Sequence, residues 1–317
     1  MSEATKRRAP WIGRAIRAGQ RYHVRTKRPL VHNAINLAAV ISLLAAIVFV
    51  AWCGGRMAPW LYLLWAPFVF GFLYFGTFVL VVHEASHGLF LISSRRRVAQ
   101  KLNRAAGWCV AVFFATHYGK HWEVGHLEHH VRPLEPMDPQ AANTIVGREL
   151  FRRASLCVFV PGYLFLDRLV FRKKPKGGKS SSSAFVIVLF VVLWSSVVAL
   201  ATMLVGWQSG VALFLGVNVI VGLNYIKGAL EHGGAIGHEA DSFLRSRSSF
   251  FFARHLLMPF NITLHFEHHL NYRIPWYDLV RYHRDLEAIV PPEIAAAVWN
   301  HRPMAQLRGE LGGVTSL

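Results

Sequence analysis

Long uncharged stretches alternate with polar, basic segments along the chain, and this pattern predicts four membrane-spanning helices. Pro29–Gly55 carries no charged side chain, and its part Ile35–Trp52 is long enough to cross about 30 Å of hydrocarbon as a helix. Trp60–Val82 is again uncharged and runs directly into His83. Ser180–Ile226 is about twice as long as one crossing needs, and GWQSG breaks it near its middle. We therefore expect spans near residues 34–53, 58–82, 184–206 and 210–231, arranged as two hairpins.

The basic residues predict the orientation of these spans. The chain has 35 Lys and Arg against 17 Asp and Glu. Nine basic residues precede the first span, sixteen lie in residues 81–183 and eight in residues 232–317, whereas the turns on the other side hold only Arg56. This asymmetry predicts that both termini and the long middle segment face the cytoplasm, in a bacterial inner membrane. Because the charge is spread over every inner segment, it does not indicate nucleic-acid binding.

Composition agrees with a membrane protein. Hydrophobic residues make up 53% of the 317 residues and charged residues only 16%, which excludes an ordinary soluble two-domain enzyme. Three cysteines in separate apolar stretches do not suggest a disulfide framework. The predicted fold class is an all-α integral membrane protein, one domain over residues 1–317, with four transmembrane helices and a cytoplasmic helical cap in 83–183 and 232–317.

Shorter segments complete this picture. The basic N-terminal segment 1–33 does not resemble a signal peptide, and the spacing in Lys6–Arg28 suits a helix lying on an anionic inner leaflet. Ala105–Ala115 and Ala154–Phe171 are predicted to be interfacial or buried helices. Residues 175–183, PKGGKSSSS, are typical of a flexible linker.

Histidine is the unusual residue type, with 17 in the chain, and nine of them form a recurring pattern. HEASH occupies residues 83–87, and the spacing HxxHH occurs twice, as HLEHH at 126–130 and HFEHH at 265–269. On a helix, positions i, i+3 and i+4 share one face, so each cluster can present its imidazoles together. A ninth histidine stands in Glu231-His232-Gly233, where the fourth span should return to the cytoplasm. The predicted metal ligands are His83, His87, His126, His129, His130, His232, His265, His268 and His269.

The number of ligands favours two metal ions. HExxH alone is also the signature of zinc proteases, in which Glu84 would be the general base, but that interpretation leaves both HxxHH segments without a role. Nine imidazoles suit two ions with four or five ligands each, and imidazole suits iron. A metal carrier would instead place ligands deep in the spans, which hold almost no polar groups. We interpret the other histidines as surface or structural residues, with His121 the most plausible extra ligand; they are His23, His32, His117, His121, His238, His255, His283 and His301.

These segments resemble the membrane fatty acid desaturase superfamily, which includes fatty acyl hydroxylases, carotenoid hydroxylases and ketolases, and alkane monooxygenases. HEASH resembles the first histidine box of that family, and WEVGHLEHH at 122–130, followed by Asp138-Pro139, resembles the second. HFEHHLNYRIPWY at 265–277 is similar to the third box, and Glu231-His232-Gly233 to an additional ligand motif. The resemblance implies a non-haem centre of two iron ions that is reduced by an external donor and reacts with O2.

The chain also departs from parts of that family. Some acyl desaturases have an amide side chain one helical turn before the additional histidine, where this sequence has Gly228; Asn224, a further turn back, is the candidate substitute. We identify no fused cytochrome domain, and HxxHH in the last box differs from the QxxHH of cytochrome-fused desaturases. The expected electron donor is therefore a separate ferredoxin, rubredoxin or cytochrome, and the basic cytoplasmic face could dock such an acidic partner.

Three carboxylates lie between the predicted ligands. We expect Glu84, Glu128 and Glu267 to accept hydrogen bonds from imidazole N–H groups and so to orient the rings. The alternative is that they are solvated carboxylates at helix ends.

The expected substrate is a long apolar chain that enters between the hairpins. An acyl chain is favoured, presented as acyl-CoA, acyl carrier protein or intact lipid, and a carotenoid is an alternative. Such a site can desaturate its substrate by taking a second hydrogen or hydroxylate it by returning oxygen. Desaturation is the preferred interpretation and hydroxylation the alternative.

Overall fold

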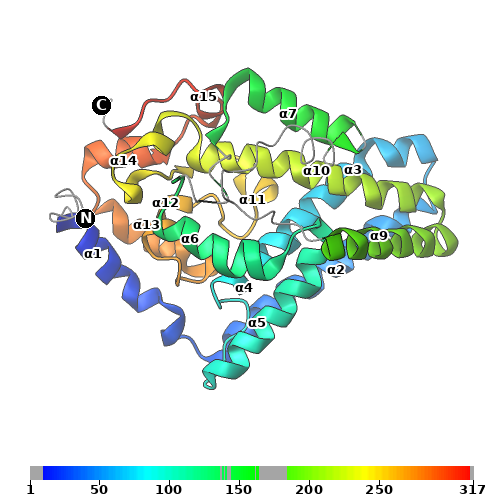
Figure 1. Cartoon of the computed structure of the whole chain (residues 1–317), viewed down its shortest axis with the longest axis horizontal. Coiled ribbons are helices and arrows are strands. Elements are labelled where there is room, and N and C mark those ends of the chain that lie inside the picture. Colours follow the sequence, from blue (N-terminus) through cyan, green and yellow to red (C-terminus); the bar gives the residue numbers. More distant parts are fainter. Residues whose placement is uncertain are drawn as a thin grey trace.

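The computed structural model describes residues 10–135, 138, 140, 144–160, 162–163 and 184–314, and helices dominate it (Figure 1). Four of them are long and apolar enough to cross a membrane. They are α2 (Pro29–Gly54), α3 (Pro59–Thr77, continuing without a break to Ser86), α9 (Ala184–Leu204) and α10 (Trp207–His232). The four predicted spans are confirmed, and the protein is an integral membrane protein of the all-α class.

The two central spans, α3 and α10, pack against each other through small residues. A Cβ atom on Gly216 would lie 2.6 Å from the Cβ of Phe70 and 2.9 Å from Cε2 of Tyr74. A Cβ on Gly71 would lie 2.3 Å from Cγ1 of Val219. Because lipid tails are as apolar as leucine, such close backbone approach is a main source of helix association in membranes.

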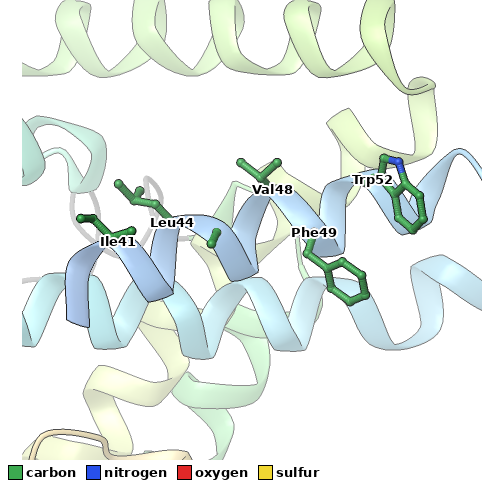
Figure 2. Close-up of a pocket in the computed structure, with 6 residues that line it drawn as sticks. Ile41, Leu44, Val48, Phe49 and Trp52 are labelled. Carbon is green, nitrogen blue, oxygen red and sulfur yellow. The ribbon is translucent and has the colours of Figure 1, made fainter. Parts of the chain in front are cut away.

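The other two spans, α2 and α9, expose most of their side chains. Figure 2 shows the outer face of α2, a shallow apolar surface without a charged group, lined by Ile41, Leu44, Ala45, Val48, Phe49 and Trp52. Such a face suits contact with lipid tails.

Replacing Gly216 by leucine is expected to destabilise the protein, because the new side chain must push α3 away from α10. Overpacking of this kind costs about 1–3 kcal/mol of unfolding free energy. Thermal unfolding of the purified protein in detergent measures the effect. Leucine at Ala45, on the exposed face of α2, is the matched control and should leave the melting temperature unchanged. Equal melting temperatures for the two variants would contradict the packing of α3 on α10.

Most of the shorter helices gather at one end of the spans, whereas α7 (Gly147–Phe159) runs alongside α10 (Figure 1). The other shorter helices are α1 (Pro10–Gly19), α4 (Glu84–Ser86), α5 (Arg96–Ala111), α6 (Gly125–Val131), α11 (Arg254–Leu257), α12 (His265–Leu270), α13 (Leu279–Glu287), α14 (Pro292–Val298) and α15 (Pro303–Arg308). Two short strands, β1 (Ser248–Ser249) and β2 (Trp299–Asn300), pair in parallel.

The two ambiguous apolar stretches belong to helices in the described part of the chain. The first, Ala105–Ala115, is the second half of α5 and the turn after it. In the first half of α5, the apolar side chains of Val98 and Leu102 are exposed. The second, Ala154–Phe171, overlaps the end of α7, but most of its remainder lies outside the described residues, as does the predicted linker 175–183.

The N-terminal helix α1 has a different partner from the one that its pattern suggested. Trp11, Ile12 and Ala15 are buried, and they pack in one cluster with Phe266 of α12 and Tyr282 of α13. The apolar face of α1 is therefore covered by protein, and the expectation that it lies on a membrane leaflet is wrong for this face. An amphipathic pattern shows that one face of a helix is covered, but not what covers it.

Candidate metal centre

The structure brings all nine predicted histidines together in two adjacent groups. In each group the potential ligand nitrogens lie within 4.8 Å of one another. The groups share a boundary, because the ring centroids of His130 and His269 are 4.3 Å apart. The five-histidine group consists of His83, His87, His126, His130 and His268, and the four-histidine group of His129, His232, His265 and His269.

Each HxxHH segment supplies both groups. In α6, His126 and His130 join the five-histidine group, whereas His129 joins the other. In α12 the assignment is reversed: His265 and His269 join the four-histidine group, and His268 joins the five-histidine group. The i and i+4 positions thus serve one group and the i+3 position serves its neighbour, which explains why two groups need only one helical face from each segment.

Two wide helical turns precede the first and second histidine boxes. Phe78–His83 (η4) and Tyr118–Val124 (η6) are π-helical. A π turn inserts an extra residue into an α-helix and so rotates the side chains that follow, and such turns are frequent at functional sites. After His87 the helix ends, and Gly88 adopts a positive φ of 69° that favours glycine. These local features aim His83 and His87 at the histidines of α6.

The Nε2 atoms of several rings face each other at the separation expected of ligands of one ion. His265 Nε2 lies 2.9 Å from His232 Nε2, which in turn lies 3.2 Å from His129 Nε2. In the other group, His130 Nε2 lies 3.1 Å from His268 Nε2. Metal–imidazole bonds are about 2.1 Å long, so neighbouring ligands of one ion lie about 3 Å apart. The donor set therefore fits two metal ions.

Buried nitrogens without a hydrogen-bond partner support the same conclusion. Among the described residues they include Nε2 of His83, His87 and His269. Leaving a buried polar atom unsatisfied costs about 1–3 kcal/mol. A bound cation accounts for these atoms, since each would then donate its lone pair to the metal.

In three of the rings, those of His129, His232 and His126, the Nδ1 atom contacts an oxygen atom or an amide. His129 Nδ1 donates to Asp138 at 2.7 Å, and His232 Nδ1 donates to the backbone oxygen of Arg245 at 2.7 Å. The side-chain amide of Gln140 lies 2.8 Å from His126 Nδ1. These contacts fix the orientation of the three rings and leave their Nε2 atoms free to face the centre.

Two buried glutamates, on α10 and α4, face imidazoles at longer distances. Glu231 Oε1 lies 3.2 Å from His265 Nδ1, and its second oxygen pairs with Lys227 Nζ at 2.6 Å. Glu84 Oε1 lies 3.5 Å from His83 Nδ1.

Burial keeps the imidazoles in the neutral form that binds metal. It lowers the pKa of His268 to about 3 and also lowers the pKa values of His126 and His130. For Asp138, burial opposes ionisation, but the hydrogen bond from His129 and those from two backbone N–H groups lower the pKa overall. The ionised Asp138 accepts from His129 Nδ1, which strengthens this ring as a metal ligand.

Replacing Asp138 by asparagine is expected to weaken metal binding and activity by about 10–100-fold, because His129 loses its charged partner. In the wild-type protein the backbone N–H groups of Leu134 and Gln140 donate to the Asp138 carboxylate, and in the variant they would face a neutral side-chain amide instead. Iron content after dialysis against a chelator measures the effect. The exposed Glu293, changed to glutamine, provides the control. Equal iron retention in both variants would show that Asp138 does not tune the centre.

The predicted carboxylate contacts need correction. Of the three glutamates only Glu84 lies next to a histidine of the two groups. Glu128 is exposed, with Oε1 3.9 Å from Nε of Arg132, so the solvated alternative holds for it. Glu267 is fully buried, but it accepts from His283 and Trp299 on the far side of α12.

Asn224 is exposed on α10 and so does not replace the missing amide. Besides Glu84, the carboxylates that approach the rings are Asp138 and Glu231. Both stood in the quoted motifs, but their contacts depend on tertiary structure.

The remaining histidines lie outside both groups in the described part of the chain. His121 packs against Trp122, with ring centroids 5.4 Å apart, and joins neither group. His32 is buried and hydrogen bonds to Tyr277 Oη and the backbone oxygen of Leu89, so it ties α2 to the segment after the first box.

Comparison with known proteins gives one match. No curated protein and no solved structure is detectably similar to the chain. The family model described as "Fatty acid desaturase" matches residues 58–301, which is more than three quarters of the chain and includes all nine histidines. The matched region begins at the second span and ends beyond the third histidine box. The chain therefore belongs to the fatty acid desaturase family.

Proposed function

We propose that the protein is a membrane-bound, O2-dependent oxidoreductase that desaturates a long acyl chain at a non-haem centre of two iron ions. The family makes it a desaturase- or hydroxylase-type enzyme. The observation that carries the proposal is the division of the nine clustered imidazoles into groups of five and four. Imidazole ligands suit iron, and two ions use all nine.

Within this proposal the chain positions the reactants and excludes water. The five- and four-histidine groups would each hold one iron, and bound iron with O2 supplies the oxidising power that an unactivated methylene requires. Asp138, Gln140 and the backbone oxygen of Arg245 hold the rings in place. Eight of the nine histidines are buried, which keeps the centre dry.

Hydroxylation remains the alternative outcome at the same site. The protease interpretation finds less support, because His83 and His87 lie among three histidines of the other boxes instead of around an open three-ligand site. A metal carrier is also disfavoured, because the nine histidines gather at one end of the spans and not along them.

We further propose that both termini and the metal centre face the cytoplasm, on the basis of the charge asymmetry. The acyl chain would reach the centre from the membrane as acyl-CoA, acyl carrier protein or lipid, and a ferredoxin, rubredoxin or cytochrome would supply electrons.

Product analysis tests the reaction. The protein is expressed in a host with a suitable reductase, and its lipids are compared by mass spectrometry with those of a strain carrying the His268→Ala variant. Desaturation predicts a loss of about two mass units and hydroxylation a gain of about sixteen. The proposal would be refuted if the lipids were identical to those of the variant strain and the purified protein contained one zinc ion and no iron.

A further inference from the structure

One aromatic side chain connects the five-histidine group to the surface. The ring centroid of Tyr272 lies 5.2 Å from that of His87 and 5.2 Å from that of His130, and the planes are tilted by 35° and 38°. His130 is the one histidine of the nine that is not fully buried, and Tyr272 is itself partly exposed. At this point the proposed ligands come nearest to the exterior.

Three arginines gather beside Tyr272. Arg273 follows it in the chain, and the Arg273 backbone oxygen accepts from Val24 N at 3.0 Å, which brings the η3 turn (Val24–Thr26) and its exposed Arg25 alongside. The third is Arg96, which is exposed at the start of α5 and lies near enough to Arg273 for the two positive charges to interact. Burial lowers the pKa of Arg273, and the positive charges of Arg25 and Arg96 lower it further.

This positive charge has no internal counterpart. Among the residues that the structure describes, no carboxylate forms an ion pair with Arg25, Arg96 or Arg273. The three segments that carry them all lie outside the spans. A cluster of like charges at the surface attracts an anionic partner and increases its rate of association.

We propose that Tyr272, Arg25, Arg96 and Arg273, together called the Tyr272 surface, receive an acidic one-electron carrier protein: the arginines bind the carrier, and electrons enter the five-histidine group through the Tyr272 ring. This inference rests on the proposed function. Desaturation takes two hydrogen atoms from the substrate, and O2 becomes two waters by accepting these together with two further electrons and two protons. Two reduced carriers each lose one electron per turnover, and the protons come from solvent.

The aromatic contact favours a carrier over the phosphate of a substrate head group. A phosphate would need only the arginines, whereas electron delivery also needs close contact between the surface and the ligands. Tyr272 supplies that contact to two histidines at once. Charge pairs at the rim of an interface mainly change association rates and their salt dependence.

The test follows anaerobic reduction of the iron-loaded, full-length protein by a reduced [2Fe–2S] ferredoxin in a stopped-flow spectrometer. The double variant Arg25→Glu/Arg96→Glu is expected to raise the apparent dissociation constant for ferredoxin about tenfold or more, without changing the limiting rate. Tyr272→Leu is expected to lower the limiting rate several-fold with the dissociation constant unchanged. A merely structural role would not separate the two constants in this way.

The control is Arg148→Glu/Arg302→Glu, which makes the same charge change at exposed arginines of other segments. Equal dissociation constants for the two double variants would overturn the proposal. If the Arg25→Glu/Arg96→Glu variant kept its dissociation constant for ferredoxin but bound stearoyl-CoA more weakly, the proposal would be overturned in favour of a phosphate site. If charge reversal prevents folding, Arg25→Gln/Arg96→Gln should show a smaller effect in the same direction. Failure of the wild-type protein to bind iron would instead refute the proposed function.

Discussion

Alanine at His269 is expected to empty the four-histidine group while the five-histidine group keeps its metal. His269 Nε2 is buried and has no other partner, and its ring packs 4.5 Å from that of His265. Iron content should fall from about two to about one per chain, because three remaining imidazoles leave an incomplete site. Activity should fall more than about 100-fold, since even changes outside the ligands cost 10–100-fold.

The neighbouring residue gives the complementary variant. His268→Ala removes a ligand from the five-histidine group, although it lies only one position away in α12. Elemental analysis and Mössbauer spectroscopy of the two variants should therefore report the loss of different irons. His238→Ala, at an exposed histidine outside both groups, is the control and should retain two irons and full activity. Loss of both irons in either variant would contradict the division into two separate groups.

The histidines could be predicted from sequence because their geometry is local. HxxHH places three imidazoles on one helical face whatever surrounds the helix. His83 and His232 stand at the ends of spans that length and hydropathy define. What spacing could not show is that i and i+4 serve one group and i+3 the other, because this division depends on how α6 and α12 face each other.

The residues that orient the ligands could not be predicted in the same way. Asp138 and Gln140 follow α6 in irregular backbone, and the partner of His232 is the backbone oxygen of Arg245. No side-chain pattern encodes a backbone acceptor. The π turns before the first two boxes also leave no periodic signal, because one extra residue changes the register without changing the composition.

HLEHH and HFEHH are alike in pattern, yet their central glutamates have opposite surroundings. Glu128 is exposed on α6. Glu267 is completely buried and accepts from His283 Nδ1 at 2.6 Å, from Trp299 Nε1 at 2.9 Å, and from the Ser248 hydroxyl. Its carboxylate thus ties α12 to α13, β1 and β2, behind the metal centre.

Alanine at Glu267 is expected to lower the melting temperature by roughly 5 °C or more, because the buried Ser248 hydroxyl and the partly buried His283 and Trp299 lose their acceptor at a cost of about 3 kcal/mol or more. Iron binding should weaken as well, since α12 carries three of the nine histidines. Alanine at Glu128 occupies the same place in the other box and gives up only an exposed contact with Arg132, worth less than about 1 kcal/mol. Thermal unfolding in detergent and iron analysis compare the two variants. Similar losses of melting temperature and iron content in both variants would mean that the burial of Glu267 does not make its carboxylate more important than that of Glu128. Each carboxylate would then stabilise only the helix that carries it.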